Sequence, residues 1–357
     1  MENIRVGIIG TGFGAKVHAP MFQHHNHFNV VSIATVSGKR VEETKKISGV
    51  ENIYTNWKEM LEKEDLDLVV ISSAPFLHKE MVVEALHRGI HVLCEKPMAL
   101  NKEEAIAMCA AQKKAKKFGF INHEWRFLPA RLKVKEIIEK GTLGTVHHIR
   151  YIASYPLYSS LTSRKWGWLG DREKGGGMLG AIGSHMIDSL YWWTASEFAE
   201  VFANLFSHVP EFRDEQGAIE RRTADDGFQV NGKLKNGTTV TLELATAIRK
   251  PKQTYLLEIF GSKGSLVMTD DHDIQLSIDD KTFERVEFEP DLVPPKAMTP
   301  VVSRYYNGFY QMLDALADSF HSTDKHPVLA DFEDGLRVQR ALDGIRQSAN
   351  EERKITI

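Results

Sequence analysis

Two short groups of residues in this chain of 357 have the types and spacing needed for acid–base chemistry. One is Glu95-Lys96-Pro97, and the other is the pair His185 and Asp188. A lysine can donate to a substrate oxygen, and an imidazole near a carboxylate is a usual proton-transfer pair. Both groups also have a structural interpretation, because solvated loop charges and a core histidine bonded to an aspartate fit the same residues.

The residues before Lys96 favour a functional position. His91–Cys94 is a short apolar run that suits a buried strand. Pro97 must end that strand, because proline lacks an N–H and biases Lys96 toward an extended backbone. Since ligands bind at the carboxyl ends of strands in open α/β sheets, Lys96 is a candidate catalytic residue.

The second group lies in a segment with helical spacing, 178–193, which the run Gly175-Gly176-Gly177 opens. His185 and Asp188 are three residues apart and therefore share one face of that helix. Ile182, Met186, Ile187 and Leu190 give the helix an apolar side. We expect His185 and Asp188 to be catalytic, with a buried structural pair as the alternative.

A glycine turn directly follows the first apolar run, Ile4–Ile9. Its residues are Gly10, Thr11, Gly12, Phe13, Gly14 and Ala15, and a helix is expected over 16–23. Gly10 permits a tight turn, Gly12 lets a pyrophosphate approach the backbone, and small Ala15 lets helix and strand pack closely. The helix N-terminus then offers N–H groups to phosphates, so these six residues predict a dinucleotide site.

The predicted second strand, 30–36, ends in Ser37, Gly38, Lys39 and Arg40. An NAD-selective site usually has an acid here to bond the ribose 2′-hydroxyl, and none is present. A hydroxyl and two cations suit a 2′-phosphate instead. We therefore expect NADP as the cofactor, with NAD as the alternative, although a polar turn whose cations face water would have the same composition.

Two further strand ends complete the predicted cofactor edge. A strand over 67–73 turns at 74–78, and a short strand over 118–122 follows the helix predicted for 102–117. The turn after the former strand is where a nicotinamide would lie. The remaining residues expected to contact the cofactor are Ser73, Ala74, Pro75, Leu77, His78, Glu95, Lys96, Pro97, Asn122 and Arg126.

Strands and helices alternate up to residue 122, which predicts an α/β fold with a doubly wound parallel sheet in residues 1–124. After residue 196 the pattern changes to strands that alternate in polarity, with a hairpin at Asn236-Gly237. Helices return over 305–321 and 331–350. Residues 125–357 are therefore expected to form an α+β domain with a mostly antiparallel, open sheet.

Composition excludes several classes of protein. The formal charge of -3 gives no basic surface, so we expect no nucleic-acid partner. No apolar run reaches membrane length, and two cysteines, Cys94 and Cys109, form no redox or metal spacing, which fits a cytoplasmic setting. His24, His25 and His27 have no carboxylate or cysteine at ligand spacing, so no metal site is expected. The lysines at 113, 114, 116 and 117 form a basic cluster that we interpret as solvated charges at a helix end.

In this order, the glycine turn, Glu95-Lys96-Pro97 and Gly175–Gly177 followed by His185 and Asp188 resemble the Gfo/Idh/MocA oxidoreductases over essentially the full length. The resemblance implies a Rossmann domain, then an α+β domain whose open sheet often forms the subunit interface, giving a homodimer or homotetramer. It also implies hydride transfer between a nicotinamide and a sugar, polyol or related carbonyl. Lys96 and His185 would act at the substrate oxygen, Asp188 would orient or assist, and Arg126 and Pro129 match family positions.

The chain departs from the family pattern at two positions. Ala181 stands where the family often has an aspartate, four residues before His185, and Pro75 replaces an asparagine-type residue. The cofactor site is unaffected, and the substrate is put in question. We therefore predict an NADP-preferring dehydrogenase or reductase acting on a secondary alcohol of a sugar or cyclitol. The alternatives are a non-catalytic dinucleotide-bound sensor and a redox-neutral sugar-modifying enzyme that retains its cofactor.

Overall fold

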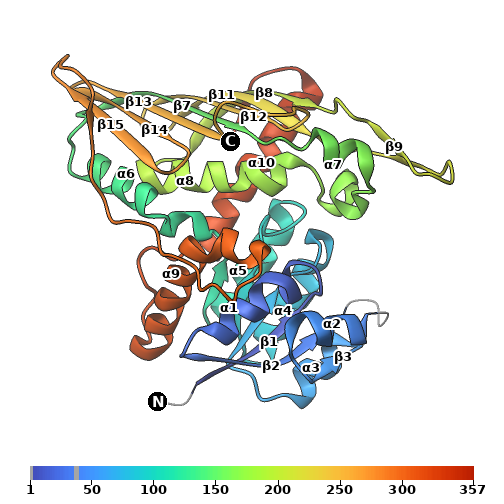
Figure 1. Cartoon of the computed structure of the whole chain (residues 1–357). Coiled ribbons are helices and arrows are strands. Elements are labelled where there is room, and N and C mark those ends of the chain that lie inside the picture. The colour runs from blue at the N-terminus through green and yellow to red at the C-terminus, as the bar shows by residue number, and fades with distance from the viewer. Residues whose placement is uncertain (1–2, 36–39) are drawn as a thin grey trace. The chain divides into compact units, whose positions relative to one another are not determined.

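A computed structural model describes residues 3–35 and 40–357 of the chain. The chain divides into two compact units (Figure 1). The N-terminal unit contains residues 1–127 and 291–336, and the C-terminal unit contains residues 128–290 and 337–357. This division differs from a single cut after residue 124, because a late segment of the chain returns to the first unit. The predicted domain boundary at that residue stays a prediction.

The N-terminal unit is built on a six-stranded sheet in the order β3-β2-β1-β4-β5-β6. All of its strand pairs are parallel. The order reverses between β1 and β4, and ligands of doubly wound folds bind at this switch point. The predicted Rossmann fold is confirmed. Its strands are β1 Ile4–Ile9, β2 Phe28–Ala34, β3 Ile53–Tyr54, β4 Leu68–Ile71, β5 His91–Cys94 and β6 Gly119–Ile121.

Helices cover both faces of this sheet, and each face has its own core. On one face, α1 and α9 pack on Val6, Ile8 and Val70. On the other, α3, α4 and α5 pack on Val69 and Val92. The long helix α9 therefore supplies the cover that α1 alone is too short to give, which explains why residues 291–336 belong to this unit. The helical segments are η1 Gly14–His18, α1 Ala19–His24, α2 Val41–Ser48, α3 Trp57–Lys63, η2 Pro75–Leu77, α4 His78–His87, α5 Lys102–Ala115, η3 Glu124–Phe127 and α9 Pro300–Ser322.

The C-terminal unit holds a nine-stranded sheet in the order β16-β15-β14-β13-β7-β12-β11-β8-β17. Its neighbours pair antiparallel except β7 and β12, so the predicted mostly antiparallel sheet is confirmed. The strands are β7 Val146–Ser154, β8 Phe198–Phe206, β11 Gly227–Leu234, β12 Thr239–Ala245, β13 Tyr255–Gly261, β14 Gly264–Thr269, β15 Asp273–Ile278, β16 Glu284–Arg285 and β17 Ile355–Thr356. The helical segments are α6 Pro129–Glu139, α7 Tyr158–Ser163, η4 Gly167–Gly170, η5 Arg172–Lys174, η6 Leu179–Gly183, α8 Ser184–Thr194 and most of α10 Phe332–Glu351.

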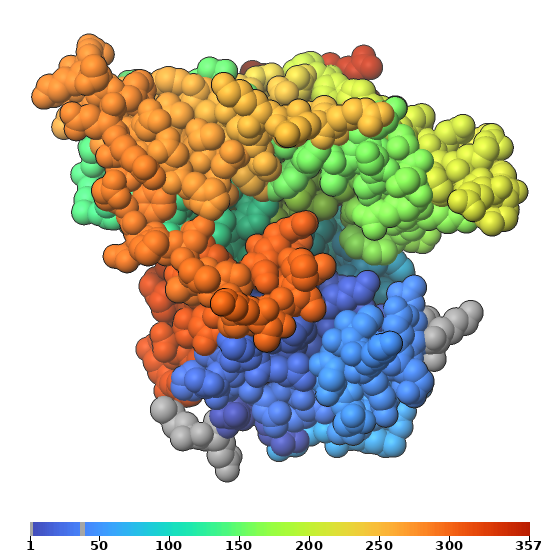
Figure 2. Space-filling model, viewed as in Figure 1, coloured from blue at the N-terminus to red at the C-terminus, as the bar shows by residue number. Residues whose placement is uncertain are grey.

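One face of the large sheet is covered by α6, α8 and α10, as Figure 1 shows. Side chains alternate accordingly along β7: Ile149 and Tyr151 are buried toward the helices, whereas Arg150 is exposed on the other face. That second face carries an Arg150–Glu258 ion pair of 2.9 Å and an exposed Phe202. A separate hairpin, β9 Glu211–Arg213 with β10 Ile219–Arg221, projects from the edge of this unit (Figure 2).

Several boundaries differ from the sequence prediction. The second strand begins at Phe28 and ends at Ala34, two residues earlier at each end than predicted. The helix predicted to reach Lys117 ends at Ala115, because Lys116 adopts a left-handed conformation. The short elements α2, β3, α3, β9, β10 and β15–β17 were not predicted, since two- to eight-residue segments give little periodic signal. Among the described residues, no helix combines the length and the apolar composition that crossing a membrane requires.

Candidate functional site

The glycine turn after β1 is shaped as the predicted dinucleotide motif requires. Gly10 has a φ of 125°, and a Cβ built there would lie 2.2 Å from the carbonyl oxygen of Ser72. Only glycine fits, because the turn passes directly against the end of β4 at the switch point. Gly14 is similarly close to β1, with Ile8 Cγ2 at 3.0 Å from its ideal Cβ.

Gly12 differs from its neighbours, since a Cβ built there meets no atom within 4 Å. The space beside this backbone is therefore open, which is the condition for close approach of a pyrophosphate. Helical structure follows at once in η1, and Ala15 is fully buried beneath it. The residues present fit a dinucleotide whose phosphates lie against Gly12 and the first N–H groups of η1.

The predicted cofactor-selectivity residues are only partly described. Ser37, Gly38 and Lys39 lie outside the described residues. Arg40 precedes α2, and its side chain is 62% exposed with Glu43 4.0 Å away. An ion pair at that distance on an exposed surface holds the guanidinium weakly, so Arg40 keeps most of its capacity to bind another anion.

The loop after β4 contains the predicted contacts Ser73, Ala74, Pro75, Leu77 and His78. His78 is fully buried, with Nε2 3.1 Å from the Ser73 oxygen and Nδ1 3.2 Å from the Pro97 oxygen. Burial lowers the pKa of His78 and outweighs the carbonyl contacts that raise it. A neutral ring donates to only one of these two oxygens, so the buried His78 ring fills the space between the loop after β4 and the loop after β5 and bonds one of them. A direct contact with a cofactor stays a prediction.

Glu95 is the centre of a buried hydrogen-bond network at the end of β5. One of its carboxylate oxygens, Oε1, lies 2.7 Å from His18 Nε2 and accepts a 2.7 Å bond from Asn122 Nδ2. His18 and Asn122 are 0% and 1% exposed. Because an ionised carboxylate only accepts, His18 carries its proton on Nε2. Its Nδ1 is buried and has no hydrogen-bond partner among the described residues.

This network keeps Glu95 charged beside Lys96. Burial opposes ionisation, but His18, Lys96 and Asn122 together lower the pKa of Glu95 to about 2. The carboxylate also faces the Lys96 backbone, with Oε2 3.3 Å from the Lys96 nitrogen. A fixed negative charge therefore lies next to the predicted catalytic lysine, which is itself partly exposed. His18 was not among the predicted site residues, because nothing in its local sequence indicates that it faces β5.

Asn122 and Arg126 were both predicted to contact the cofactor. The Asn122 N–H donates to Cys94 at 2.8 Å, so the residue continues the sheet beside β5. Arg126 is 4% exposed, and its Nη1 lies 3.4 Å from both the Val328 oxygen and Asp334 Oδ2. In the N-terminal unit, Arg126 therefore binds the returning segment, and a cofactor contact by it stays a prediction.

In the C-terminal unit, His185 and Asp188 lie on α8, as predicted, and each is 2% exposed. The expected apolar side is present, since Met186, Ile187 and Leu190 are fully buried. The sequence placed these residues on one helix, and the helix begins with the irregular turn η6 Leu179–Gly183. The catalytic role of the pair stays a prediction.

Asp225 fixes the start of the His185 helix. Its Oδ2 accepts a 2.7 Å bond from the Leu179 N–H, and its carbonyl accepts one of 3.0 Å from Met178. Gly177, at a φ of 105°, passes so close that a Cβ would lie 2.2 Å from Asp225 Oδ1. Burial raises the pKa of Asp225 to about 6, against the bond from Leu179 and the charge of Arg346. The glycine run 175–177 was expected to open this helix, but nothing in the sequence indicated that it lies against Asp225.

The histidines at 24, 25 and 27 lie at the end of α1 and just after it. His25 is buried and lies 3.0 Å from Asp314, and its ring packs on Tyr310. Among residues 3–35 and 40–357, no three histidine, cysteine or acidic side chains are grouped as metal ligands. These histidines join α1 to α9 within the N-terminal unit.

The parallel sheet, the glycine turn at its switch point and Lys96 at the same edge define a dinucleotide-binding oxidoreductase fold. The chain matches the model of an oxidoreductase family, NAD-binding Rossmann fold, over residues 4–123. It also matches the C-terminal alpha/beta domain of the same family over residues 135–357. The chain belongs to the Gfo/Idh/MocA oxidoreductase family.

Several similar proteins carry the names of sugar dehydrogenases or sugar oxidoreductases. The chain is 30% identical to human glucose-fructose oxidoreductase domain-containing protein 2 over 96% of this chain and 91% of that protein. It is 29% identical to levoglucosan dehydrogenase of Pseudarthrobacter phenanthrenivorans over 75% of this chain and 74% of that protein. A solved structure of levoglucosan dehydrogenase, in complex with NADH and L-sorbose, shares the fold with a TM-score of 0.87 at 24% identity, covering 100% of this chain and 99% of that one.

Proposed function

We propose that this chain is an NAD(P)-dependent dehydrogenase or reductase that acts on a secondary alcohol or ketone of a sugar, cyclitol or related polyol. The observation that carries the proposal is Lys96 at the carboxyl end of β5, beside a Glu95 carboxylate that two buried side chains hold. The similarity to a levoglucosan dehydrogenase supports the sugar-like substrate class.

The proposed chemistry assigns one role to each polar group. A bound nicotinamide would supply the hydride transfer. Lys96 donates to the substrate oxygen, His185 takes the hydroxyl proton during oxidation and returns it during reduction, and Asp188 orients the imidazole. A positioned acid–base group contributes about 10²–10⁴-fold, and positioning and electrostatics supply the rest of the rate enhancement.

We propose NADP as the preferred cofactor, with NAD as the alternative. The proposal rests on the hydroxyl and two cations of Ser37, Lys39 and Arg40, and on the absence of an acid after the second strand. Exposure of the Arg40 guanidinium supports it. The remaining proposed contacts are Gly10–Ala15, Gly38, Ser73, Ala74, Pro75, Leu77, His78, Glu95, Lys96, Pro97, Asn122 and Arg126.

A self-associating, cytoplasmic enzyme is the proposed working form. The uncovered face of the nine-stranded sheet combines the exposed Phe202 with the Arg150–Glu258 pair. A face of mixed apolar and paired charged groups suits an interface between copies, and the family often uses its open sheet in this way. We therefore propose a homodimer or homotetramer.

The test is a hydride-transfer assay with a panel of sugars and polyols and both cofactors. We expect stoichiometric formation or consumption of NADPH, and a loss of at least about 10²-fold in kcat for Lys96→Met and for His185→Ala. Cofactor dissociation constants should change much less than kcat, because the phosphates are expected to be held by the glycine turn. A stable, fully active His185→Ala protein would remove the catalytic role of that residue, and an active Lys96→Met protein would refute the proposal.

A second candidate is a non-catalytic sensor that binds the dinucleotide. Ala181 favours it, since a methyl group replaces the carboxylate that the family often has at this position. Tight binding of NADP(H) without turnover on any sugar would indicate the sensor. Conversion of a sugar without net change in NADPH would indicate a redox-neutral enzyme that retains its cofactor.

A further inference from the structure

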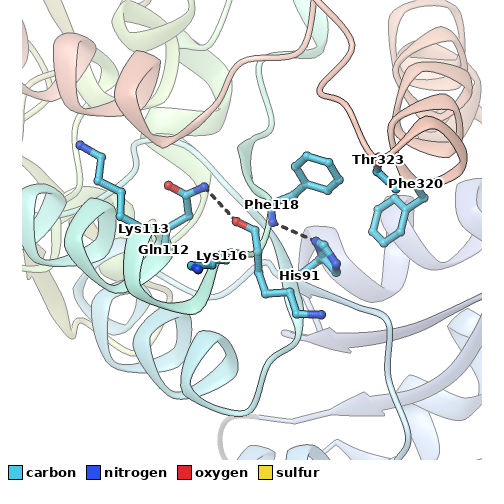
Figure 3. A pocket seen from close by; sticks show the side chains of 8 residues that line it. His91, Gln112, Lys113, Lys116, Phe118, Phe320 and Thr323 are labelled. Atoms are coloured by element: carbon cyan, nitrogen blue, oxygen red, sulfur yellow. Dashed lines mark hydrogen bonds between the residues drawn. The ribbon is translucent and has the colours of Figure 1, made fainter.

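A cavity of about 420 Å³ lies in the N-terminal unit, at the opposite end of β5 from Lys96. Figure 3 shows side chains from three elements around it: His91 begins β5, the lysines end α5, and Phe320 lies near the end of α9. We call it the α5–α9 pocket. Its size falls in the range of small-molecule sites. Its lining residues are His91, Gln112, Lys113, Lys116, Lys117, Phe118, Phe320 and Thr323.

Three rings form one wall of the pocket. The His91 ring lies 5.1 Å from Phe118 and 4.8 Å from Phe320, and the two phenyl rings are 6.1 Å apart. All three are half-buried, so each still presents part of its surface to the cavity. Such a wall suits an aromatic ligand, because offset or edge-to-face contacts between rings are favourable beyond simple burial.

The polar side chains of the lining include cations and neutral hydrogen-bonding groups, and no carboxylate. Lys113 is paired with Glu333 at 2.7 Å, so its charge is compensated. Among the described residues, Lys116 and Lys117 have no carboxylate within ion-pair distance. Two uncompensated ammonium groups beside an aromatic wall favour a ligand that carries a negative charge.

His91 adds a directed donor. Its Nδ1 accepts a 2.9 Å bond from the Phe118 N–H, as the dashed line in Figure 3 marks. Burial, reinforced by the charge of Lys117 and opposed by Asp67, lowers the pKa of His91 to about 4. The ring is therefore neutral near pH 7 and carries its proton on Nε2, which can donate to a ligand.

The backbone at the pocket departs from the usual helix ends. Lys116 and Thr323, which end α5 and α9, both have positive φ values, of 54° and 64°. Helices usually place glycine there, and a β-branched residue such as threonine is a clear outlier. Gln112 also holds the turn after α5, donating to the Lys117 oxygen at 2.9 Å. Conformations of this kind persist where the surrounding structure holds them, as it does here at the rim of the pocket.

We propose that the α5–α9 pocket binds a small aromatic anion, a ring that carries a carboxylate or phosphate group. The ring lies against His91, Phe118 and Phe320, and the anionic group meets Lys116 and Lys117. The site is separate from the proposed hydride-transfer site, because His91 and Lys96 are at opposite ends of β5. The proposal therefore does not depend on the proposed enzymatic function.

Binding is tested by calorimetry with phenyl phosphate and benzoate, with NADPH present in excess to occupy the dinucleotide site. Two control compounds separate the parts of the ligand: inorganic phosphate has the anionic group without a ring, and benzyl alcohol has the ring without a charge. We expect at least one aromatic anion to bind with a submillimolar dissociation constant, and inorganic phosphate and benzyl alcohol to bind at least about 10-fold more weakly. Affinity should fall as salt is added, because Lys116 is exposed to solvent and Lys117 is partly exposed.

Variants locate the site. The double variant Lys116→Gln and Lys117→Gln should raise the dissociation constant of the aromatic anion at least about 10-fold, which corresponds to about 1.4 kcal/mol. Phe320→Leu should weaken it several-fold. Lys114→Gln is the matched control, since Lys114 is exposed on the same helix and does not line the pocket. If the double variant has a lowered melting temperature, Lys116→Gln alone carries the test, because that side chain is exposed.

Three results would overturn the proposal. Dissociation constants above about 1 mM for both aromatic anions would mean that the pocket has no such ligand. Equal weakening by Lys114→Gln would mean that general positive charge, rather than this pocket, attracts the anions. Inorganic phosphate binding as tightly as phenyl phosphate would remove the role of the aromatic wall.

Discussion

Replacing Glu95 by glutamine removes the buried negative charge beside Lys96 while keeping the size of the side chain. The wild-type carboxylate accepts bonds from His18 and Asn122, both at 2.7 Å. The carbonyl oxygen of glutamine can still accept from both donors, but its NH₂ group cannot accept from the Lys96 N–H that lies 3.3 Å from Oε2, and the negative charge is lost. We expect Glu95→Gln to destabilise the N-terminal unit at neutral pH.

The size of the effect follows from the pKa of Glu95. The shift from its ordinary value of 4.5 to about 2 corresponds to about 3 kcal/mol of stability at pH 7. Because the folded-state pKa is the lower one, this stability is fully present above pH 4.5 and is lost as pH falls toward 2. By pH 3 roughly 2 kcal/mol of it should be gone.

The measurement is urea unfolding of wild type and Glu95→Gln between pH 7 and pH 3, with hydrogen exchange of the β5 amides to report on the N-terminal unit. The stability difference between the two proteins should be constant down to about pH 5 and then shrink. Glu62→Gln serves as the control, since Glu62 is an exposed carboxylate on α3. A difference that stays flat within about 0.5 kcal/mol from pH 7 to pH 3 would refute an ionised, buried Glu95.

Three further outcomes are expected. Gly12→Ala should leave the melting temperature unchanged, since its Cβ enters open space, and should weaken the binding of NADPH and NADH by at least about 10-fold. Gly10→Ala should lower the melting temperature, because its Cβ would lie 2.2 Å from Ser72. Equal effects of the two variants on melting and on binding would contradict this. Ser37→Asp should repel a 2′-phosphate and shift the ratio of measured dissociation constants toward NAD, and an unchanged ratio would reject the cofactor assignment. Light scattering at micromolar concentration should give the mass of a dimer or tetramer. Phe202→Glu, on the open face of the large sheet, should dissociate this oligomer, and a monomeric wild-type protein would count against the proposed interface.

The N-terminal sheet could be predicted from the sequence because its signals are local. Apolar runs such as Leu68–Ile71 and His91–Cys94 are buried, apart from the half-buried His91, and each is followed by a turn signal. The glycine turn could be predicted in detail, because the motif requires glycine at positions 10 and 12 for two different steric reasons. The strand that ends before Glu95 was correct to the residue.

The contacts between distant segments could not be predicted. Nothing local indicates that α9 covers the first sheet, because its apolar stripe would suit any core. The same limit applies to His18 and Asp225, which reach Glu95 and Leu179 across 77 and 46 residues. A polar side chain on a helix or loop has no periodic signal, so its partner is known only once the fold brings the two together.

His18 connects the dinucleotide turn to the lysine that the proposed chemistry needs. It lies at the end of η1, whose start follows Gly12, and its ring is held by Phe13 and Phe309 at centroid distances of 5.2 and 5.0 Å. We therefore expect the same five-residue segment to offer N–H groups to the phosphates of the proposed cofactor at one end, while His18 at its other end contacts the Glu95 carboxylate. Because the Lys96 backbone follows Glu95 directly, the proposed phosphate site and Lys96 would both depend on one element. An apolar residue at position 18 could not make the 2.7 Å contact to the buried Glu95 carboxylate on which this arrangement depends.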